Sequence, residues 1–313
     1  MSGGNFEAPV LVPDTPSEVG AGQWVYVPTR RSGRLAKWKN PIGIAGGIIV
    51  GFNVFVALFG SLLWSTNPND LVGLRLEDPS WAHPMGTDEL GRDTLARIIH
   101  GAQVSLQVGA ISVGIAFVLG VSLGLLSGFF GGKVDSLLMR LVDMMFALPG
   151  LVLAIVIAGL LGPNRRNAMI AIGIVITPAF ARVVRGSVLE VMGFPFVESA
   201  RALGASHKRI MVRNVLPNIA APLIVLVTVY LSTAILSEAA LSFLGLGTQP
   251  PEASWGGMLN SARSYLDADP WLSIFPGLAI AIVVLGFNFL GDGLRDILDP
   301  RLGPHVGGAD TKK

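Results

Sequence analysis

Long apolar runs separated by short polar segments dominate the sequence from residue 41 onward. A helix needs about 20 apolar residues to cross the roughly 30 Å hydrocarbon core of a bilayer, and six runs approach that length. Membrane-spanning strands would be shorter and would alternate polar with apolar residues, which these runs do not. The pattern therefore predicts an all-α, multi-pass membrane protein with six transmembrane helices, in the runs 41–64, 104–126, 144–161, 168–185, 219–238 and 271–290.

The basic residues predict how these helices are oriented. Cytoplasmic segments accumulate Lys and Arg, and with the N-terminus inside, 17 of the 23 basic residues fall in inner segments. We therefore expect both termini in the cytoplasm. The organisation is then a cytoplasmic N-terminal tail and interfacial segment (1–40), a six-helix transmembrane domain (41–302) with a cytoplasmic loop at about 194–218, and a cytoplasmic C-terminal tail (303–313).

Composition supports a membrane protein and narrows its partners. Hydrophobic residues make up 51% of the chain and charged residues only 14%, whereas soluble domains carry about 25% charged residues. The net charge of +2 and the scattered basic residues argue against nucleic acid as a partner. The absence of cysteine excludes disulfides, thiolate metal sites and cysteine nucleophiles. Residues 24–41, with three aromatic and five basic side chains, form either an interfacial segment against anionic lipid or an ordinary positive-inside anchor.

Three motifs resemble catalytic, nucleotide-binding or metal-binding signatures but fail on their context. Residues 120–124 match the nucleophile elbow of serine hydrolases, yet that elbow joins a strand to a helix and Ser122 lies inside a predicted span. Residues 127–134 resemble a phosphate loop, but Ser127 replaces its first Gly and Val134 its metal-binding Ser or Thr. The four histidines lack metal-ligand spacing. We therefore expect no nucleotide, metal or catalytic site in this chain.

Charged groups at membrane depth, which mark proton-coupled carriers, are few. Asp143 lies three residues after Arg140 on the same helical face, where a local ion pair explains it. Glu238 lies near the outer end of the fifth run. A secondary transporter would therefore have little ionisable chemistry to use.

Small residues and prolines predict how the helices pack and bend. Glycines recur every four residues in two rows, which lets another backbone approach closely, within the chain or in a partner. Prolines inside or near the ends of four spans permit kinks, which suit a moving pathway and a static bundle equally. The glycines are Gly43, Gly47 and Gly51, then Gly120, Gly124, Gly128 and Gly132; the prolines are Pro149, Pro178, Pro222 and Pro276.

The polar segment between the fourth and fifth runs predicts two short helices at an angle. Pro195 is suited to a first helical position, and Glu198 then falls in the first turn, where the helix dipole favours an acid. Gly204 supplies a turn that other residues adopt less easily. A second, basic helix follows from about Ser206 and runs into Pro217. Together the two helices form a projecting knob, which implies a partner.

The same segment carries a resemblance to a known family. "ESARALG" followed by "IMVRNVLPN" is similar to the EAA signature of bacterial ABC-importer permeases: a Glu, a small residue and Ala, then Gly, and after a spacer Ile and Leu-Pro. Ser199 stands where the second signature residue is commonly Ala, which exchanges one small residue for another. Four further blocks, in order, resemble the C-type permease subunit of the dipeptide and oligopeptide branch, at 83–106, 129–150, 237–259 and 287–302.

The resemblance implies a type I ABC importer permease fold and a coupling role for the knob. In that family the loop forms a coupling helix, which docks into a groove of the cytosolic ATPase and carries ATP-driven motion to the spans. The residues that the resemblance assigns to ATPase coupling are Glu198, Ser199, Ala200, Leu203, Gly204, Ala205, Ser206, Leu216 and Pro217. The residues that contact the solute have no signature in the sequence.

The resemblance also implies the setting of the protein. It would be a non-catalytic subunit in the bacterial cytoplasmic membrane, paired with a homologous B-type permease, two cytosolic ABC ATPases and an extracytoplasmic solute-binding protein, and it would import di- or oligopeptides. ATP and Mg would be bound by the ATPases, so the chain itself needs no cofactor. The outer segments 65–103 and 239–270, with Trp81, Trp255 and Tyr265, form either the platform for the binding protein or ordinary loop caps.

Three alternatives remain open at this point. Relatives that carry nickel or other small solutes share the same sequence blocks. A proton-coupled carrier would transport by itself, driven by a pH gradient. A membrane-embedded hydrolase would require Ser122.

Overall fold

The computed structural model describes residues 40–298; the predicted N-terminal tail up to residue 39 and the C-terminal tail lie outside the described residues. Within that range the regular secondary structure is helical, with connecting turns and loops and two isolated β-bridges, which confirms the all-α prediction. In chain order the helices are α2 (Pro41–Leu63), α3 (Thr94–Phe130), α4 (Gly132–Phe146), α5 (Gly150–Leu161), α6 (Arg165–Met192), α7 (Pro195–Ala202), α8 (His207–Ile210), α9 (Ala220–Phe243), α10 (Trp255–Ala262) and α11 (Trp271–Leu298).

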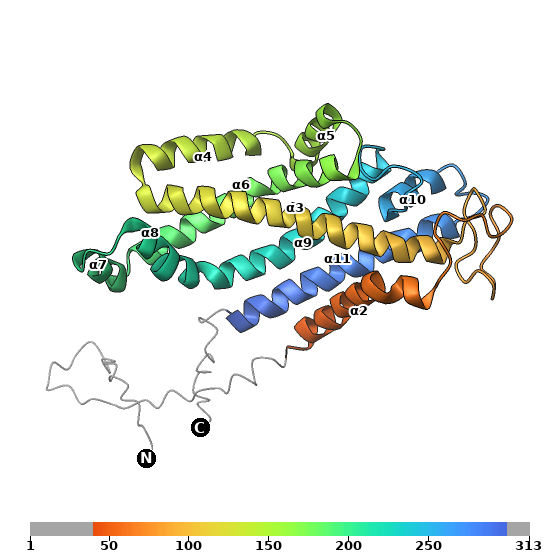
Figure 1. Cartoon of the computed structure of the whole chain (residues 1–313), viewed down its shortest axis with the longest axis horizontal. Coiled ribbons are helices and arrows are strands. Elements are labelled where there is room, and N and C mark those ends of the chain that lie inside the picture. Colours follow the sequence, from red (N-terminus) through yellow and green to blue (C-terminus); the bar gives the residue numbers. More distant parts are fainter. Residues whose placement is uncertain (1–39, 299–313) are drawn as a thin grey trace, which may run out of the picture. The chain divides into compact units, whose positions relative to one another are not determined.

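Five helical stretches in the described residues are long and apolar enough to cross a membrane, or six if the bent pair α4–α5 counts as one span. These long helices run roughly alongside one another in Figure 1. The five are Pro41–Leu63, Thr94–Phe130, Arg165–Met192, His207–Phe243 and Trp271–Leu298.

The predicted third span, 144–161, is wrong as a single helix. The chain is helical from Gly132, stops at Phe146, and resumes at Gly150 after a bend of 90°. Pro149 explains the break, because proline has no N–H to donate and disfavours helical geometry in the residue before it. The third apolar run therefore forms parts of two helices, α4 and α5, on either side of a sharp bend.

Side-chain caps set several helix ends beyond the apolar runs. Asp93 accepts a hydrogen bond from the Ala96 N–H, so α3 starts ten residues before the predicted run at 104. Asn164 caps α6 by accepting from the Arg166 N–H. Such caps satisfy helix N–H groups that have no intrahelical partner. Hydrophobicity alone marks the lipid-embedded part of a helix, and not its full length.

The second row of glycines packs as predicted over three of its four members. An added Cβ at Gly120 would lie 2.7 Å from the Thr177 carbonyl oxygen, and one at Gly124 would lie 2.5 Å from that of Ala181. Gly128 likewise meets Val188. These contacts bring the backbones of α3 and α6 together at a distance that only glycine permits. Figure 1 shows the two helices side by side.

Gly132 does not belong to that row, because it has a positive φ of 54° and begins α4 with open space around it. Within the chain, only part of the first row packs closely. Gly43 packs against Gly293 of α11, but Gly47 and Gly51 have no atoms near an added Cβ. Gly46 makes the second close contact, against Phe289 and Leu290. Helix α2 therefore packs against α11 through Gly43 and Gly46, which are three residues apart. Gly47 and Gly51, which continue the four-residue spacing from Gly43, do not pack closely against α11.

The predicted local partner of Asp143 is also wrong. Asp143 in α4 pairs with Arg182 in α6, with a distance of 2.7 Å between Nη2 and Oδ1. Arg182 falls near the inner end of the predicted fourth run, 168–185, but α6 continues ten residues beyond it to Met192. The ion pair therefore joins two helices at a level well inside them.

Candidate functional site

Helix α7 begins and ends as the sequence predicts. It starts at Pro195, and Glu198 lies in its first turn. At its end, Gly204 has a φ of +77°, and the Ala205 N–H donates to the Ala200 carbonyl at 3.0 Å. A left-handed residue closing the last turn in this way is the usual stop for a helix, and glycine adopts it without strain. The chain consequently reverses direction and begins α8 at His207.

The second helix of the knob differs from the prediction, because it does not end at Pro217. Ser206 caps it by accepting from the Arg209 N–H at 3.4 Å. After four residues the helix widens into a π-helical turn, Met211–Val215, and then tightens into a 3₁₀ turn, Leu216–Ile219, which leads directly into α9. The whole stretch His207–Phe243 is long and apolar enough to count as one span. The knob is thus the direct extension of a membrane-crossing helix.

Aromatic contacts join the knob to the end of α3. His207 packs edge-on against Phe129 and Phe130, with ring centroids 5.6 and 5.9 Å apart. The Arg201 guanidinium lies over the Phe129 ring at 5.9 Å, within the range of a cation–π contact. Val197, from within the knob, is buried in the main core. A force applied to α7 would therefore reach α3 as well as α9.

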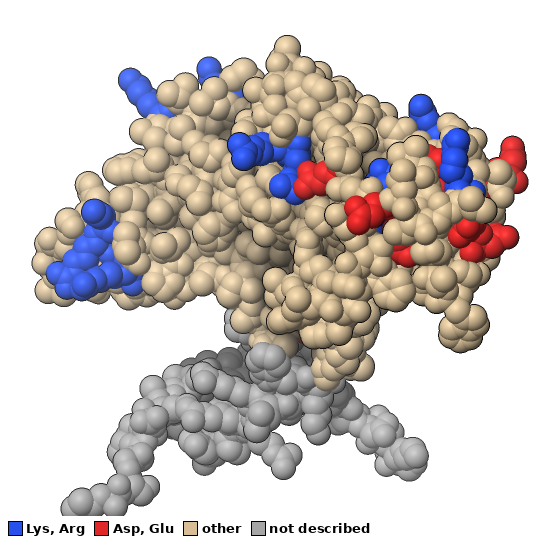
Figure 2. All heavy atoms as spheres, turned by 45° about the vertical axis from the view of Figure 1, so that its right-hand side comes forward, with Lys and Arg blue, Asp and Glu red and all other residues tan. Residues whose placement is uncertain are grey.

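The outer surface of the knob combines exposed apolar and basic side chains. Leu203 is 88% exposed, and Phe196 and Val212 are also exposed. The exposed basic residues are Arg201, Lys208, Arg209 and Arg213. Figure 2 shows basic side chains gathered at this end, on the left, while most acidic side chains on that face lie at the opposite end. An apolar patch rimmed by charge at a rigid corner is typical of a protein-docking surface.

The nine predicted coupling residues fall into two groups by burial. Glu198, Ser199, Leu203, Gly204, Ser206 and Pro217 are exposed, whereas Ala200, Ala205 and Leu216 pack against the core. The inward group positions the knob and the outward group is available to a partner. Sequence reasoning missed Phe129, Phe130 and His207, because nothing in the local pattern brings the end of α3 to α8.

A polar cluster ties α3, α4 and α6 together near the knob. The Asp135 carboxylate accepts two hydrogen bonds from the Arg185 guanidinium, at 2.6 Å each, and one from the Ser127 hydroxyl. Two-pronged pairing of this kind is geometrically specific as well as strong. Ser127, the first residue of the stretch that resembles a phosphate loop, therefore uses its hydroxyl to hydrogen-bond Asp135 within the protein.

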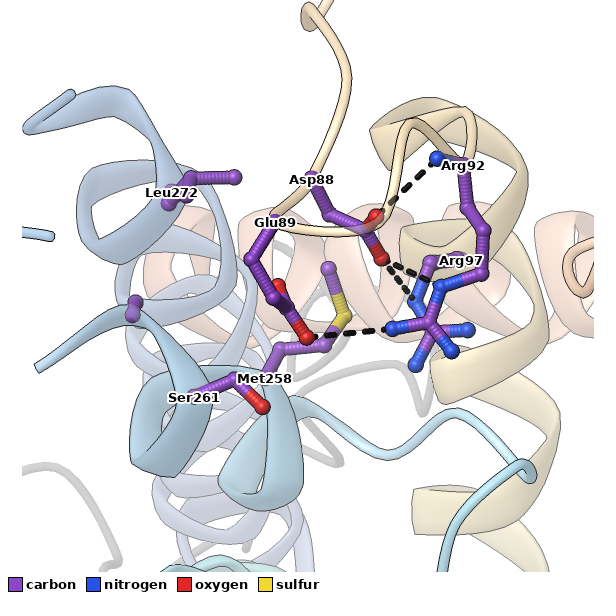
Figure 3. Close-up of a pocket in the computed structure, with 8 residues that line it drawn as sticks. Asp88, Glu89, Arg92, Arg97, Met258, Ser261 and Leu272 are labelled. Carbon is purple, nitrogen blue, oxygen red and sulfur yellow. Dashed lines mark hydrogen bonds and ion pairs between the residues drawn. The ribbon is translucent and has the colours of Figure 1, made fainter. Parts of the chain in front are cut away.

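The far end of the molecule, opposite the knob, holds a buried ion-pair network (Figure 3). Asp88 accepts from the Arg92 Nε at 2.6 Å and lies 3.3 Å from the Arg97 Nε, while Glu89 pairs with Arg92 at 3.2 Å. Asp88, Arg92 and Arg97 are all buried. The pocket beside them, also lined by Met258 and Leu272, is about 10 Å³, too small to hold a solute. The network therefore stiffens the loop and does not bind a ligand.

Neighbouring contacts extend this stiff cap. The Asp93 carboxylate, which caps α3, also accepts from the Trp64 indole N–H at 3.2 Å and lies 2.8 Å from His83 Nδ1. Trp255, for which a platform role and an ordinary loop cap were both open, is 1% exposed, and its indole N–H donates to the Ile98 carbonyl at 3.0 Å. Trp81 is fully exposed. Of these two tryptophans, only Trp81 is available to another protein.

Glu238 is a buried acid whose carboxylate accepts hydrogen bonds from hydroxyl groups. The Ser242 hydroxyl donates to its Oε1 at 2.7 Å, and the Ser105 hydroxyl lies 3.4 Å from its Oε2. These contacts connect α9 to α3 and to the following loop through Thr248. Glu238 therefore holds two helices and a loop together through hydrogen bonds.

The described residues contain no group of three His, Cys, Asp or Glu side chains placed to hold a metal ion. Ser122 donates its hydroxyl to the Val118 carbonyl within α3, at 2.7 Å. It therefore sits on a continuous helix, and lacks the strand-to-helix elbow that a serine nucleophile of that type requires.

Taken together, apolar spanning helices, a projecting knob continuous with one of them and a stiff opposite cap define a membrane permease. Residues 120–304 match the family described as "Binding-protein-dependent transport system inner membrane component", and the chain belongs to this family. It is thus a multi-pass transport subunit of the inner membrane, and the resemblance found in its sequence is confirmed.

Curated relatives cover most of the chain. It is 43% identical, over 94% of its own length and 97% of the relative's, to the dipeptide transport system permease protein DppC of Alkalihalophilus pseudofirmus. It is 46% identical to the di/tripeptide transport system permease protein DppC of Pseudomonas aeruginosa, over 83% and 88%. The glutathione transport system permease protein GsiD of Pectobacterium atrosepticum is 42% identical, over 84% and 88%.

A solved structure supports the fold. A chain of the MetNI methionine ABC transporter, in an inward facing conformation, matches with a TM-score of 0.55 over 64% of this chain and 96% of that one. The two sequences are only 20% identical, so the match speaks for the fold alone. It confirms the predicted type I ABC importer permease architecture.

Proposed function

We propose that this chain is one of two permease subunits of an ATP-driven, binding-protein-dependent importer of di- or oligopeptides. The cargo follows from the relatives, which are named for transport of dipeptides and di/tripeptides. The remaining partners would be a homologous B-type permease, two cytosolic ATPases that bind ATP and Mg, and an extracytoplasmic solute-binding protein. In this assignment both termini and the knob lie in the cytoplasm.

The observation that carries the proposal is the mechanical continuity of the knob. Its exposed face presents Leu203 and basic side chains, while its buried face is joined to α3 through His207 and to α9 through an unbroken helical path. A partner that moved the knob would therefore move two spans together. The solute pathway would then open alternately to either side as the ATPases close on ATP and separate after hydrolysis.

Leu203→Asp tests the docking surface. Leu203 is almost fully exposed, so the change removes no contact within the chain. We expect the variant to insert and fold normally but to co-purify with at least tenfold less ATPase, because a carboxylate would be desolvated in an apolar interface. Leu74→Asp is the matched control, since Leu74 is similarly exposed at the opposite end and should leave ATPase binding unchanged.

Equal ATPase binding by wild type and Leu203→Asp would exclude the knob as the docking site.

The cargo is tested separately in proteoliposomes that contain the complete complex. We expect ATP-dependent uptake of labelled dialanine in the presence of the binding protein, and none of Ni²⁺. Uptake of Ni²⁺ without dialanine would assign the protein to the small-solute alternative.

A further inference from the structure

The ion pair of Arg182 and Asp143 is unusual for its exposure within two membrane-crossing segments. Its side chains are 54% and 62% exposed, yet the pair lies deep along the helices. Arg182 is ten residues from the knob end of α6 and Asp143 eleven residues from the knob end of α4. At about 1.5 Å per residue, both charges lie roughly 15 Å from those ends. Arg182 also falls within the apolar run 168–185 expected to span the membrane, and Asp143 lies directly before the run 144–161.

The break in the third crossing lies one turn beyond Asp143. Ala147, Leu148 and Pro149 are all exposed and connect α4 to α5 through the 90° bend. No side chain caps the start of α5. The last carbonyls of α4 and the first N–H groups of α5 therefore lack the continuous helical ladder that would satisfy them.

Neither feature is compatible with a face toward lipid tails. Charged side chains at membrane depth face the bundle interior or a water-filled cavity. Non-helical backbone at that depth is tolerated only where it is buried in protein or lines such a cavity. The two observations are independent of each other, one concerning side chains and the other the main chain, and they mark the same surface.

The neighbouring contacts hold this surface in place. Arg182 is positioned by the Phe146 ring, which lies 4.2 Å from its guanidinium carbon, immediately before the break. About one turn nearer the knob, Arg185 pairs with Asp135 and joins the same two helices. The pair of Arg182 and Asp143 thus has one exposed side and one supported side, and α6 connects Arg182 directly to the knob.

We propose that the Arg182–Asp143 pair and the break at 147–149 form a wall of the water-filled route through which the solute crosses. The guanidinium and the carboxylate there contact a solute that carries both a carboxylate and an ammonium group, as a short peptide does. The solute class rests on the proposed function, whereas the position of the wall does not. Backbone groups at the break supply further hydrogen bonds to water or to peptide amides.

Cysteine labelling tests the wall directly, since the chain has no cysteine of its own. Asp143→Cys and Leu148→Cys would be treated, in the reconstituted complete complex, with a charged, membrane-impermeant methanethiosulfonate. Phe52→Cys is the matched control, because Phe52 is 63% exposed midway along α2, an apolar helix with no acidic residue in its first turn and no basic residue in its last. A thiol reacts as its thiolate, which requires water.

We expect the two wall cysteines to react at least tenfold faster than Phe52→Cys. Leu148→Cys breaks no ion pair, so it keeps the test valid if Asp143→Cys fails to assemble. Reaction of Leu148→Cys no faster than Phe52→Cys would overturn the proposal. Transported peptide, delivered by the binding protein during ATP turnover, should slow labelling of Asp143→Cys several-fold; unchanged labelling would overturn the solute contact.

The labelling does not depend on the identity of the cargo. Fast labelling together with failed dialanine uptake would leave the wall in place and reject only the peptide assignment. Slow labelling together with successful dialanine uptake would reject the wall and leave the proposed function intact.

Discussion

Single residues of the knob have distinct duties, and Gly204 is the clearest case. Its φ of +77° is available to glycine without strain and costs other residues about 1–2 kcal/mol. Its N–H also donates to the Arg201 carbonyl at 2.9 Å. Ala200, by contrast, packs against the core and supports the corner from beneath. Gly204 therefore shapes the knob through its backbone geometry, and Ala200 supports the knob through side-chain packing.

Substitutions at these two positions should separate insertion from coupling. Gly204→Pro cannot adopt a positive φ and loses the N–H, so we expect a folded, inserted protein whose complex has lost substrate-stimulated ATP hydrolysis. Ala200→Asp places a carboxylate against apolar neighbours and should have the same effect. Gly204→Ala meets open space and should retain most of the stimulated hydrolysis. Normal stimulated hydrolysis in both disruptive variants would contradict a coupling role.

At the scale of elements, the contact between α3 and α6 determines how the bundle is built. The three glycines on α3 let the backbones of the two helices come into contact. Near the knob, the hydrogen bonds of Asp135 to Ser127 and Arg185 hold α3, α4 and α6 together. Helix α9 is joined to α3 at its other end through Glu238 and Ser105. If a partner moved the knob, as proposed, the motion would pass through helices that are joined at both ends.

Glycine substitutions on α3 should distinguish its two faces. Gly124→Val would place a side chain 2.5 Å from the Ala181 carbonyl oxygen, an overlap that costs about 1–3 kcal/mol or more. Gly114→Val, in the same helix, meets nothing within 4 Å. We expect heating of the purified complex to aggregate Gly124→Val at a clearly lower temperature than wild type, with Gly114→Val unchanged. Equal melting of the two variants would show that this close approach is absent.

For the whole molecule, the two ends have different chemistry and different proposed partners. The knob end is basic and presents exposed apolar residues, whereas the opposite end is stiffened by the buried network of Asp88, Arg92 and Arg97. Under the proposed function, the positive-inside rule would place the knob in the cytoplasm. The opposite cap, with exposed Trp81, would face the binding protein.

Protease accessibility should establish this orientation. We expect tags fused before Met1 and after Lys313 to resist protease in intact spheroplasts and to be cut once the membrane is permeabilised. A tag inserted at residues 66–70 of the opposite cap is the control and should be cut in intact spheroplasts. Cleavage of the terminal tags in intact cells, with the 66–70 tag protected, would place the knob outside and exclude ATPase coupling.

Local sequence determined the helical class, the approximate spans and the shape of the knob. Apolar run length, the helix start at Pro195 and the turn at Gly204 each depend on a few neighbouring residues, so the chain specifies them wherever they lie. The family resemblance, carried by contiguous blocks, was readable for the same reason. Pro149 was named as a residue that permits a kink, and the 90° bend lies there, although the apolar run did not indicate that the helix stops.

Tertiary structure alone decided which residues meet. Asp143 pairs with Arg182, 39 positions away, and His207 packs on Phe129 and Phe130. The rotation of each helix about its axis is set by contacts with distant neighbours, so a row of glycines can pack in α3 and diverge in α2. An apolar sequence specifies that a helix is embedded, but packing determines which side of it faces protein, lipid or water.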